Sequence, residues 1–224
     1  DQKFDFVGMK YLIKASEIIV SDALYYGQKE DSHMKLHYQG KYDLNPESLP
    51  HGEHQPNAVP FKEAKDSKTM ALIANTASIV IMVLLAVPAV LRGKAHFDPL
   101  QMMLGCIAPM LILFPHELLH AICFKDDVYL YTNWKHGMLF VVGPETMSKS
   151  RFILLSLLPN ILLGFVPYLI GMLFPQFVFF LTFGTISIGM GAGDYYNVFH
   201  ALTQMPKGAR TYLYQFNSFW YLPE

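Results

Sequence analysis

Four long stretches with almost no charge constrain the fold of this chain more than any other feature. A helix needs about 20 mostly apolar residues to cross roughly 30 Å of hydrocarbon. Four stretches meet that length, at about residues 69–91, 100–124, 152–173 and 177–202. A chain of 224 residues has no outer shell in which to bury four such helices. The sequence therefore predicts an all-α membrane protein with about four transmembrane helices.

The distribution of charge divides the chain into three parts. Only 16% of the residues are charged, against roughly 25% in an average soluble domain. More than half of these charges lie in the first 68 residues. We therefore expect a polar N-terminal segment at 1–68, a transmembrane domain at 69–205 and a C-terminal tail at 206–224. The net charge of −1 gives no support for a nucleic-acid partner.

The N-terminal segment is expected to be part surface helix and part loop. Residues 4–26 mix apolar and charged side chains, too many charged for a span, and residues 42–65 contain four prolines, typical of a loop. The chain does not begin with Met, and Ser32-His33-Met34 resembles a cloning junction. Whether residues 1–33 belong to the native protein stays open.

Lysine and arginine predict how the spans are oriented. Cytoplasmic loops are enriched in these residues. Nine of them flank the spans on one side, at positions 62, 65, 68, 125, 135, 149, 151, 207 and 210, whereas the opposite side has only Arg92 and Lys94. This asymmetry favours a multi-pass protein of the cell membrane with both termini in the cytoplasm.

The second apolar stretch contains an H-E-x-x-H motif, formed by His116, Glu117 and His120. On a helix, histidines four positions apart share one face and can bind one Zn²⁺, and the intervening glutamate can act as general base. Polar groups at membrane depth are costly, and a bound cation would offset that cost. The alternative is a pair of helix-end histidines that bond backbone or headgroups, with Glu117 facing water.

Asp194 is the expected third zinc ligand. It is the only formally charged residue between Phe152 and Pro206, and its distance along the fourth span places it at a depth similar to that of His116. An isolated intramembrane carboxylate is a candidate functional group. A helix cap or a bond to a tyrosine hydroxyl would be the structural alternative.

Other potential ligands are less favoured. Glu145 and the pair Asp126 and Asp127 are expected in water, Cys123 as a small buried thiol, and His200 at the membrane interface. Exposure is expected for the histidines of the polar segment: His33, His37, His51 and His54.

Two further patterns flank this site. The β-prone runs 128–132 and 138–142 enclose a turn and predict a hairpin, whose edge could receive a substrate strand or be purely structural. Gly189 and Gly193 have the spacing that allows close helix packing. Together with Gly191, they would also permit local unwinding near Asp194.

These features resemble the site-2 protease-like intramembrane zinc metalloproteases and, within that group, a bacterial family of zincin peptidases of uncharacterised function. The resemblance covers residues 38–205. It includes H-E-L-L-H, the hairpin, the segment Pro144–Phe152, the glycine-rich run ending at Asp194, and Tyr42–Glu47. Site-2 proteases have Leu-Asp-Gly at the third ligand, whereas this chain has Gly193-Asp194-Tyr195, and their Asn-Pro motif is represented only by a reversed Pro159-Asn160.

The resemblance implies hydrolysis of membrane-embedded or juxtamembrane peptides, with the lipid bilayer and a peptide or membrane-protein substrate as partners. His116, His120 and Asp194 would bind Zn²⁺, and Glu117 would be the catalytic base. The alternatives are a non-catalytic membrane protein with a structural or peptide-binding metal site, and a transporter that uses buried carboxylates as an ion path.

Overall fold

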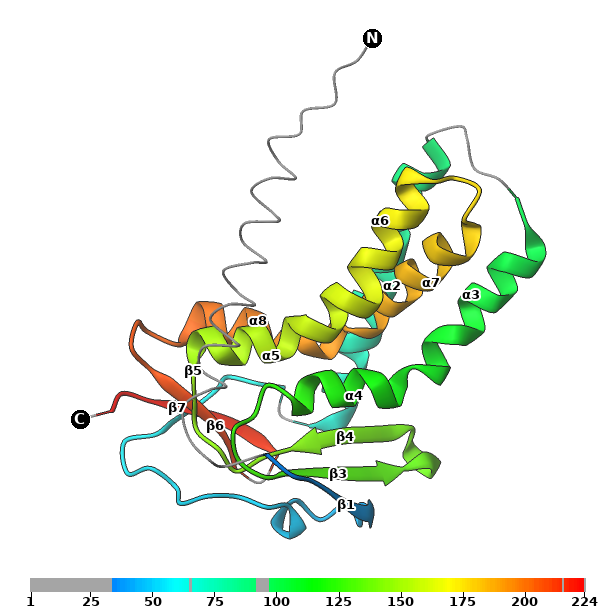
Figure 1. Ribbon diagram of the computed structural model, residues 1–224. Coiled ribbons are helices and arrows are strands. Elements are labelled where there is room, and N and C mark those ends of the chain that lie inside the picture. The colour runs from blue at the N-terminus through cyan, green and yellow to red at the C-terminus, as the bar shows by residue number, and fades with distance from the viewer. Residues whose placement is uncertain (1–33, 65, 92–96, 215, 224) are drawn as a thin grey trace.

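The computed structural model describes residues 34–64, 66–91, 97–214 and 216–223. The predictions for residues 1–33 lie outside these ranges. The described chain is mostly helical but contains two β-sheets, so the predicted all-α class is correct only in part. Figure 1 shows a helical part above the two sheets, with helices α4, α5 and α8 lying between.

The helical part contains seven α-helices and one π-helical turn within the described residues. The first is α2 (Ser67–Leu91), and the α3–α4 pair spans Pro99–Leu111 and Leu113–Ala121. The next three segments form one continuous apolar helix: α5 (Lys149–Pro159), the π-helical turn Asn160–Phe165 and α6 (Val166–Leu173). The last two are α7 (Val178–Met190) and α8 (Ala192–Gln204).

Two of the four predicted spans are helices long and apolar enough to cross a membrane, Lys68–Leu91 and Lys149–Leu173. The predicted second span is instead a pair of helices, α3 and α4, with a 45° bend between them. The predicted fourth span is divided at Gly191 into α7 and α8. Four continuous transmembrane helices are therefore not confirmed.

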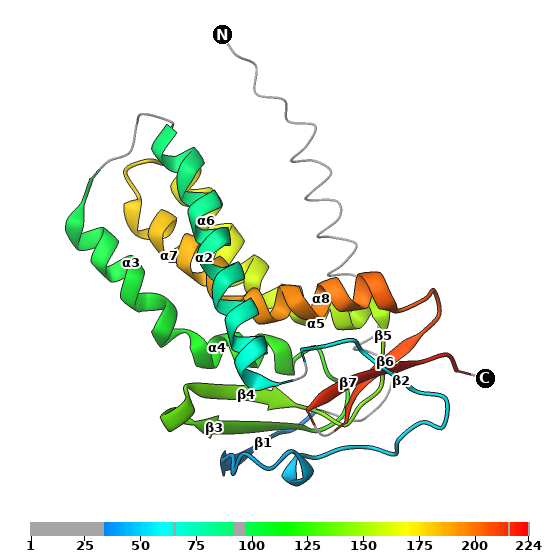
Figure 2. The same cartoon turned by 180° about the vertical axis from the view of Figure 1, so that it is seen from behind.

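Helix α2 has the surface expected of a membrane span. The Asp66 carboxylate accepts hydrogen bonds from the backbone N–H groups of Lys68 and Thr69 and so caps its first turn. Beyond this cap, large apolar side chains project outward along its length, including Leu72, Ile79, Leu84 and Val90. Soluble monomers rarely expose so large a contiguous apolar surface. The surface of α2 is therefore suited to contact with lipid. Figure 2 shows α2 running the full height of the helical part.

Proline explains why the second predicted span bends. Pro115 lies in the first turn of α4 and has no backbone N–H, so it cannot bond the carbonyl of Leu111, and its ring crowds that carbonyl. The helix therefore breaks at Ile112, whose backbone leaves the helical region (φ −96°, ψ 8°). The break turns α4, with its H-E-x-x-H motif, away from α3 and across the ends of the other helices (Figure 1).

The glycines near Asp194 pack differently from the prediction. Gly189 lies against Met82 of α2, where an added Cβ would come within 2.5 Å of a side-chain atom, but a Cβ at Gly193 would have no neighbour within 4 Å. The expected 189/193 packing pair is therefore wrong for Gly193. The close contact is instead made by Gly191, at the α7–α8 break.

The predicted hairpin is confirmed as β3 (Val128–Asn133) and β4 (Met138–Val142), which pair antiparallel. Strand β1 (Leu36–Lys41) joins β3 in parallel, which gives the order β1-β3-β4. Strand β4 is therefore an edge strand, and it contacts α4.

A second sheet has the order β2-β7-β6-β5 and was not predicted. Its strands are β2 (Val59–Pro60), β5 (Met147–Ser148), β6 (Arg210–Tyr214) and β7 (Asn217–Tyr221). The expected C-terminal tail thus contains a hairpin, and a buried cluster joins it to the helices: Phe61, Ala201, Met205 and Ala209, with Phe152, Ile153 and Trp220 packed against them.

Candidate metal centre

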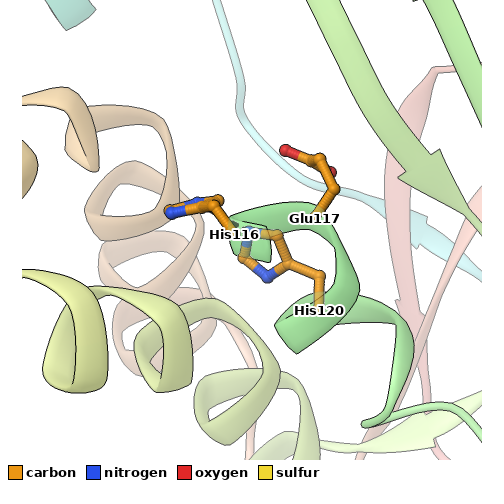
Figure 3. Close-up of side chains that lie close together, drawn as sticks. All are labelled: His116, Glu117 and His120. Atoms are coloured by element: carbon orange, nitrogen blue, oxygen red, sulfur yellow. Dashed lines mark hydrogen bonds between the residues drawn. The ribbon is translucent and has the colours of Figure 1, made fainter. Parts of the chain in front are cut away.

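The H-E-x-x-H motif lies on α4, as predicted, and its three side chains project from this short helix (Figure 3). Each of His116, Glu117 and His120 offers one ligand atom, and these atoms lie within 4.8 Å of one another. His120 is buried, and the other two side chains are partly buried. The motif therefore gathers two imidazoles and a carboxylate in a largely enclosed place.

Asp194 reaches both imidazoles from the first turn of α8. Its Oδ2 lies 3.4 Å from His116 Nε2, and its Oδ1 lies 3.4 Å from His120 Nε2. The two Nε2 atoms are 3.1 Å apart. The structure thus brings together the three residues that the sequence singles out as metal ligands.

These separations fit a tetrahedral zinc site. Zinc ligands lie about 2.0–2.2 Å from the ion, so neighbouring donor atoms of a tetrahedral shell are about 3.3–3.6 Å apart. The two Nε2 atoms are 3.1 Å apart, and each lies 3.4 Å from one oxygen of the Asp194 carboxylate, Oδ2 for His116 and Oδ1 for His120, so each separation is close to this range. Nitrogen and carboxylate oxygen are also ligands that zinc accepts.

A backbone carbonyl orients His120. Its Nδ1 lies 2.8 Å from the carbonyl oxygen of Leu155 on α5. A carbonyl can only accept, so Nδ1 carries a proton, and in the neutral ring Nε2 would present its lone pair toward Asp194 and His116. Metal-binding histidines commonly have this outer hydrogen bond.

Glu117 contacts the edge strand rather than the imidazoles. Its Oε2 accepts a hydrogen bond from the backbone N–H of Val141 on β4, at 3.0 Å. The glutamate of the motif is therefore adjacent both to the histidine pair and to the open edge of the β1-β3-β4 sheet.

Asn160 is a site residue that sequence reasoning missed. It is buried at the start of the π-helical turn, and its Nδ2 donates to Asp194 Oδ2 at 2.7 Å. The available signal was an asparagine within an apolar span, directly after Pro159, but its reversed order relative to the site-2 protease motif made it weak.

Glu145 is not in water, contrary to the prediction. Its side chain is only 7% exposed and forms a two-pronged ion pair with the Arg151 guanidinium. It also accepts the backbone N–H groups of Lys125 and Asp126. Through these bonds, the Glu145 carboxylate connects the segment that follows α4 to the start of α5.

The remaining candidates lie away from the imidazole pair. Cys123 is a partly buried thiol that bonds the Leu119 carbonyl, Asp126 is exposed, and Asp127 pairs with His37 at 2.8 Å. The hydrogen bonds from His37 and from the backbone N–H of Lys35 lower the pKa of Asp127. His51 and His54 are exposed, as expected, and His33 lies outside the described residues.

His200 is buried within the protein, and its expected position at the membrane interface stays a prediction. It is 6% exposed and packs against Phe61 and Tyr196.

Residues 109–210 match the model of a protein family described as "putative zincin peptidase". The match begins in α3 and ends at the first residue of β6, so it includes the motif and Asp194. No curated protein and no solved structure matches the chain. The similarity supports a zincin-like metallopeptidase, and two helices are long and apolar enough for a membrane protein.

Proposed function

We propose that the protein is a zinc-dependent intramembrane peptidase of the site-2 protease type. His116, His120 and Asp194 would hold the zinc ion, and Glu117 would be the general base. The observation that supports this most strongly is the convergence of two Nε2 atoms, 3.1 Å apart, with the Asp194 carboxylate, which has one oxygen within 3.4 Å of each of them.

The chain's own groups then divide the chemistry. Bound zinc would supply a Lewis acid that makes water a competent nucleophile near neutral pH and polarises the scissile carbonyl. Glu117 would take the proton of the attacking water on a carboxylate oxygen and give it to the leaving amine. The two histidines of the motif would bind the ion through Nε2, and the Leu155 carbonyl holds the His120 ring in the orientation that this requires.

Strand β4 is the proposed docking edge for the substrate. In an antiparallel pair of strands, the backbone N–H and C=O groups of successive residues point alternately toward the partner strand and away from it. Because the Val141 N–H bonds Glu117 and not β3, Val141 and Leu139 turn their backbone groups to the open side. A substrate segment added there as an extended strand would lie beside Glu117.

The position of the site suggests membrane-embedded or juxtamembrane substrates. Helix α4 lies between the apolar helices and the sheets (Figure 1). The distribution of lysine and arginine supports a multi-pass protein of the bacterial cytoplasmic membrane, with both termini and the sheet side in the cytoplasm.

The test compares cells that produce the wild-type protein with cells that produce Glu117→Gln. Zinc per purified chain and new N-termini in the membrane proteome are measured for both. We expect one zinc per chain in each, and cleavage next to membrane spans that falls about 10²–10⁴-fold in the variant. Equal cleavage in both strains would refute the role of Glu117.

The same experiment separates the alternative functions. Zinc in both proteins without any Glu117-dependent cleavage would indicate a structural or peptide-binding metal site. Absence of zinc from the wild-type protein would refute the metal centre itself. Cleavage confined to soluble proteins would contradict the membrane substrate and the docking role of β4.

A further inference from the structure

The side chain of Asn160 is held by hydrogen bonds at both ends. Its Nδ2 donates to Asp194 Oδ2 at 2.7 Å and to the Ser156 carbonyl at 3.0 Å, and its Oδ1 accepts from the Tyr195 hydroxyl at 3.3 Å. A carboxylate and a carbonyl can only accept, so the amide nitrogen must face them. The orientation of this buried amide is therefore defined by its partners.

The local helix geometry frees the Ser156 carbonyl for this contact. In a regular α-helix, the backbone N–H of residue 160 would bond the carbonyl of residue 156. Here it bonds the Leu157 carbonyl instead, and the π-helical turn begins. The Asn160 amide takes over the Ser156 carbonyl while it also reaches Asp194. Short π-helical segments are frequent at functional sites.

Gly191 leaves the space that Asn160 needs. A Cβ on residue 191 would lie 1.7 Å from Asn160 Oδ1 and 2.5 Å from its Cγ. Any larger residue at the α7–α8 break would therefore displace the amide from Asp194. Gly193, two residues on, has no atom within 4 Å of its Cβ position.

We propose that Asn160 is a positioning residue that holds the Asp194 carboxylate in its zinc-binding orientation. The last torsion of an aspartate side chain is broad, so a carboxylate that bridges two imidazoles needs an outside partner to fix it. Asn160 fixes Oδ2, which leaves Oδ1 directed at His120. The inference rests on the proposed function, because it assigns Asn160 to the same metal site.

The test measures zinc affinity by chelator competition on the full chain in detergent. Outer partners of metal ligands typically contribute 10–100-fold in affinity. Asn160→Leu and Gly191→Ala should each weaken zinc binding about 10–100-fold. The matched control Gly193→Ala should stay within about twofold, because its methyl group meets open space.

A double-variant cycle separates positioning from general support of the fold. In an Asp194→Ala background, Asn160→Leu should have no further effect on zinc affinity, because the carboxylate that it orients is gone. Asn160→Gln should recover part of the affinity. Equal effects of Asn160→Leu with and without Asp194, or unchanged affinity in the single variant, would overturn the inference.

These outcomes are distinct from failure of the proposed function. If the wild-type chain binds no zinc, the metal centre itself is refuted and Asn160 has no carboxylate to position. If the wild-type and the Asn160 variants bind zinc equally, only the positioning role is refuted.

Discussion

Two carboxylates of this protein lie in protected surroundings near α4, yet their partners differ in kind. Glu145 is matched by a guanidinium and two backbone N–H groups, all of which donate to it. Asp194 is 17% exposed, accepts a hydrogen bond from the neutral Asn160 amide, and has two imidazole nitrogens as its ion-pair partners among the described residues. One of these rings, His120, already directs its Nδ1–H to the Leu155 carbonyl. Glu145 is thus satisfied by the chain alone, whereas a bound cation, as proposed, would complete the cluster around Asp194.

The comparison shows that two carboxylates that follow the motif in sequence can have different roles. Both carboxylates follow the motif, but a carboxylate that already has a complete set of donors cannot also bind a metal without losing them. Glu145 connects the end of α4 to α5, and Asp194 on α8 lies beside the imidazoles of α4. The structural and the proposed metal-binding carboxylate are therefore distinguished by their donors.

The largest stability effect is expected at Glu145. Removing one partner of a buried ion pair costs about 3–5 kcal/mol, so Arg151→Leu should lower the unfolding free energy by about that amount. Asp194→Asn in the metal-free protein should change it by less than about 1 kcal/mol, because no cation of the chain is lost. Denaturant unfolding in detergent measures both, and the reverse ranking would break the comparison.

Much of this arrangement could be predicted from sequence. The spacing of H-E-x-x-H, the isolated charge of Asp194 and the hairpin are local or compositional signals, and each is visible without coordinates. Glu145 was misplaced because charged residues cluster around it in sequence and suggest solvent. Its burial depends on Arg151 folding back over the end of α4.

The other features that the sequence does not predict also depend on their surroundings in the fold. Strands β6 and β7 are short aromatic runs whose sheet also includes β2 and β5, which are distant in sequence. The helix bends at Ile112 because of Pro115, and a prediction from the length and hydropathy of the stretch does not take a proline into account. The role of Asn160 depends on its contacts with Gly191, at the α7–α8 break, and with Asp194 on α8. These contacts are not visible in the sequence.

A third carboxylate, that of Glu63, extends the comparison, and we expect it to have a smaller effect on stability than Glu145. Burial raises the pKa of Glu63 above its ordinary value of 4.5, against the opposing hydrogen bond from the backbone N–H of Ser218. The folded state therefore keeps a proton that the unfolded state has released, so stability falls as pH rises from about 4.5 through the raised pKa.

Replacement of Glu63 removes this dependence. The melting temperature of the wild-type protein should fall more between pH 5 and pH 8 than that of Glu63→Gln. The exposed Glu53 supplies the control, because Glu53→Gln should retain the wild-type profile. An identical pH dependence in all three proteins would show that Glu63 is not held in a desolvated place.

The most direct measurement is zinc X-ray absorption spectroscopy on the wild-type protein, Asp194→Cys and Glu145→Cys. The wild-type shell should contain two imidazoles with oxygen and no sulfur, although Cys123 lies just beyond the motif. A cysteine at position 194 should add one zinc–sulfur distance of about 2.3 Å, and a cysteine at position 145 should add none. A shell without sulfur in zinc-loaded Asp194→Cys would contradict the assignment of Asp194 as the third ligand.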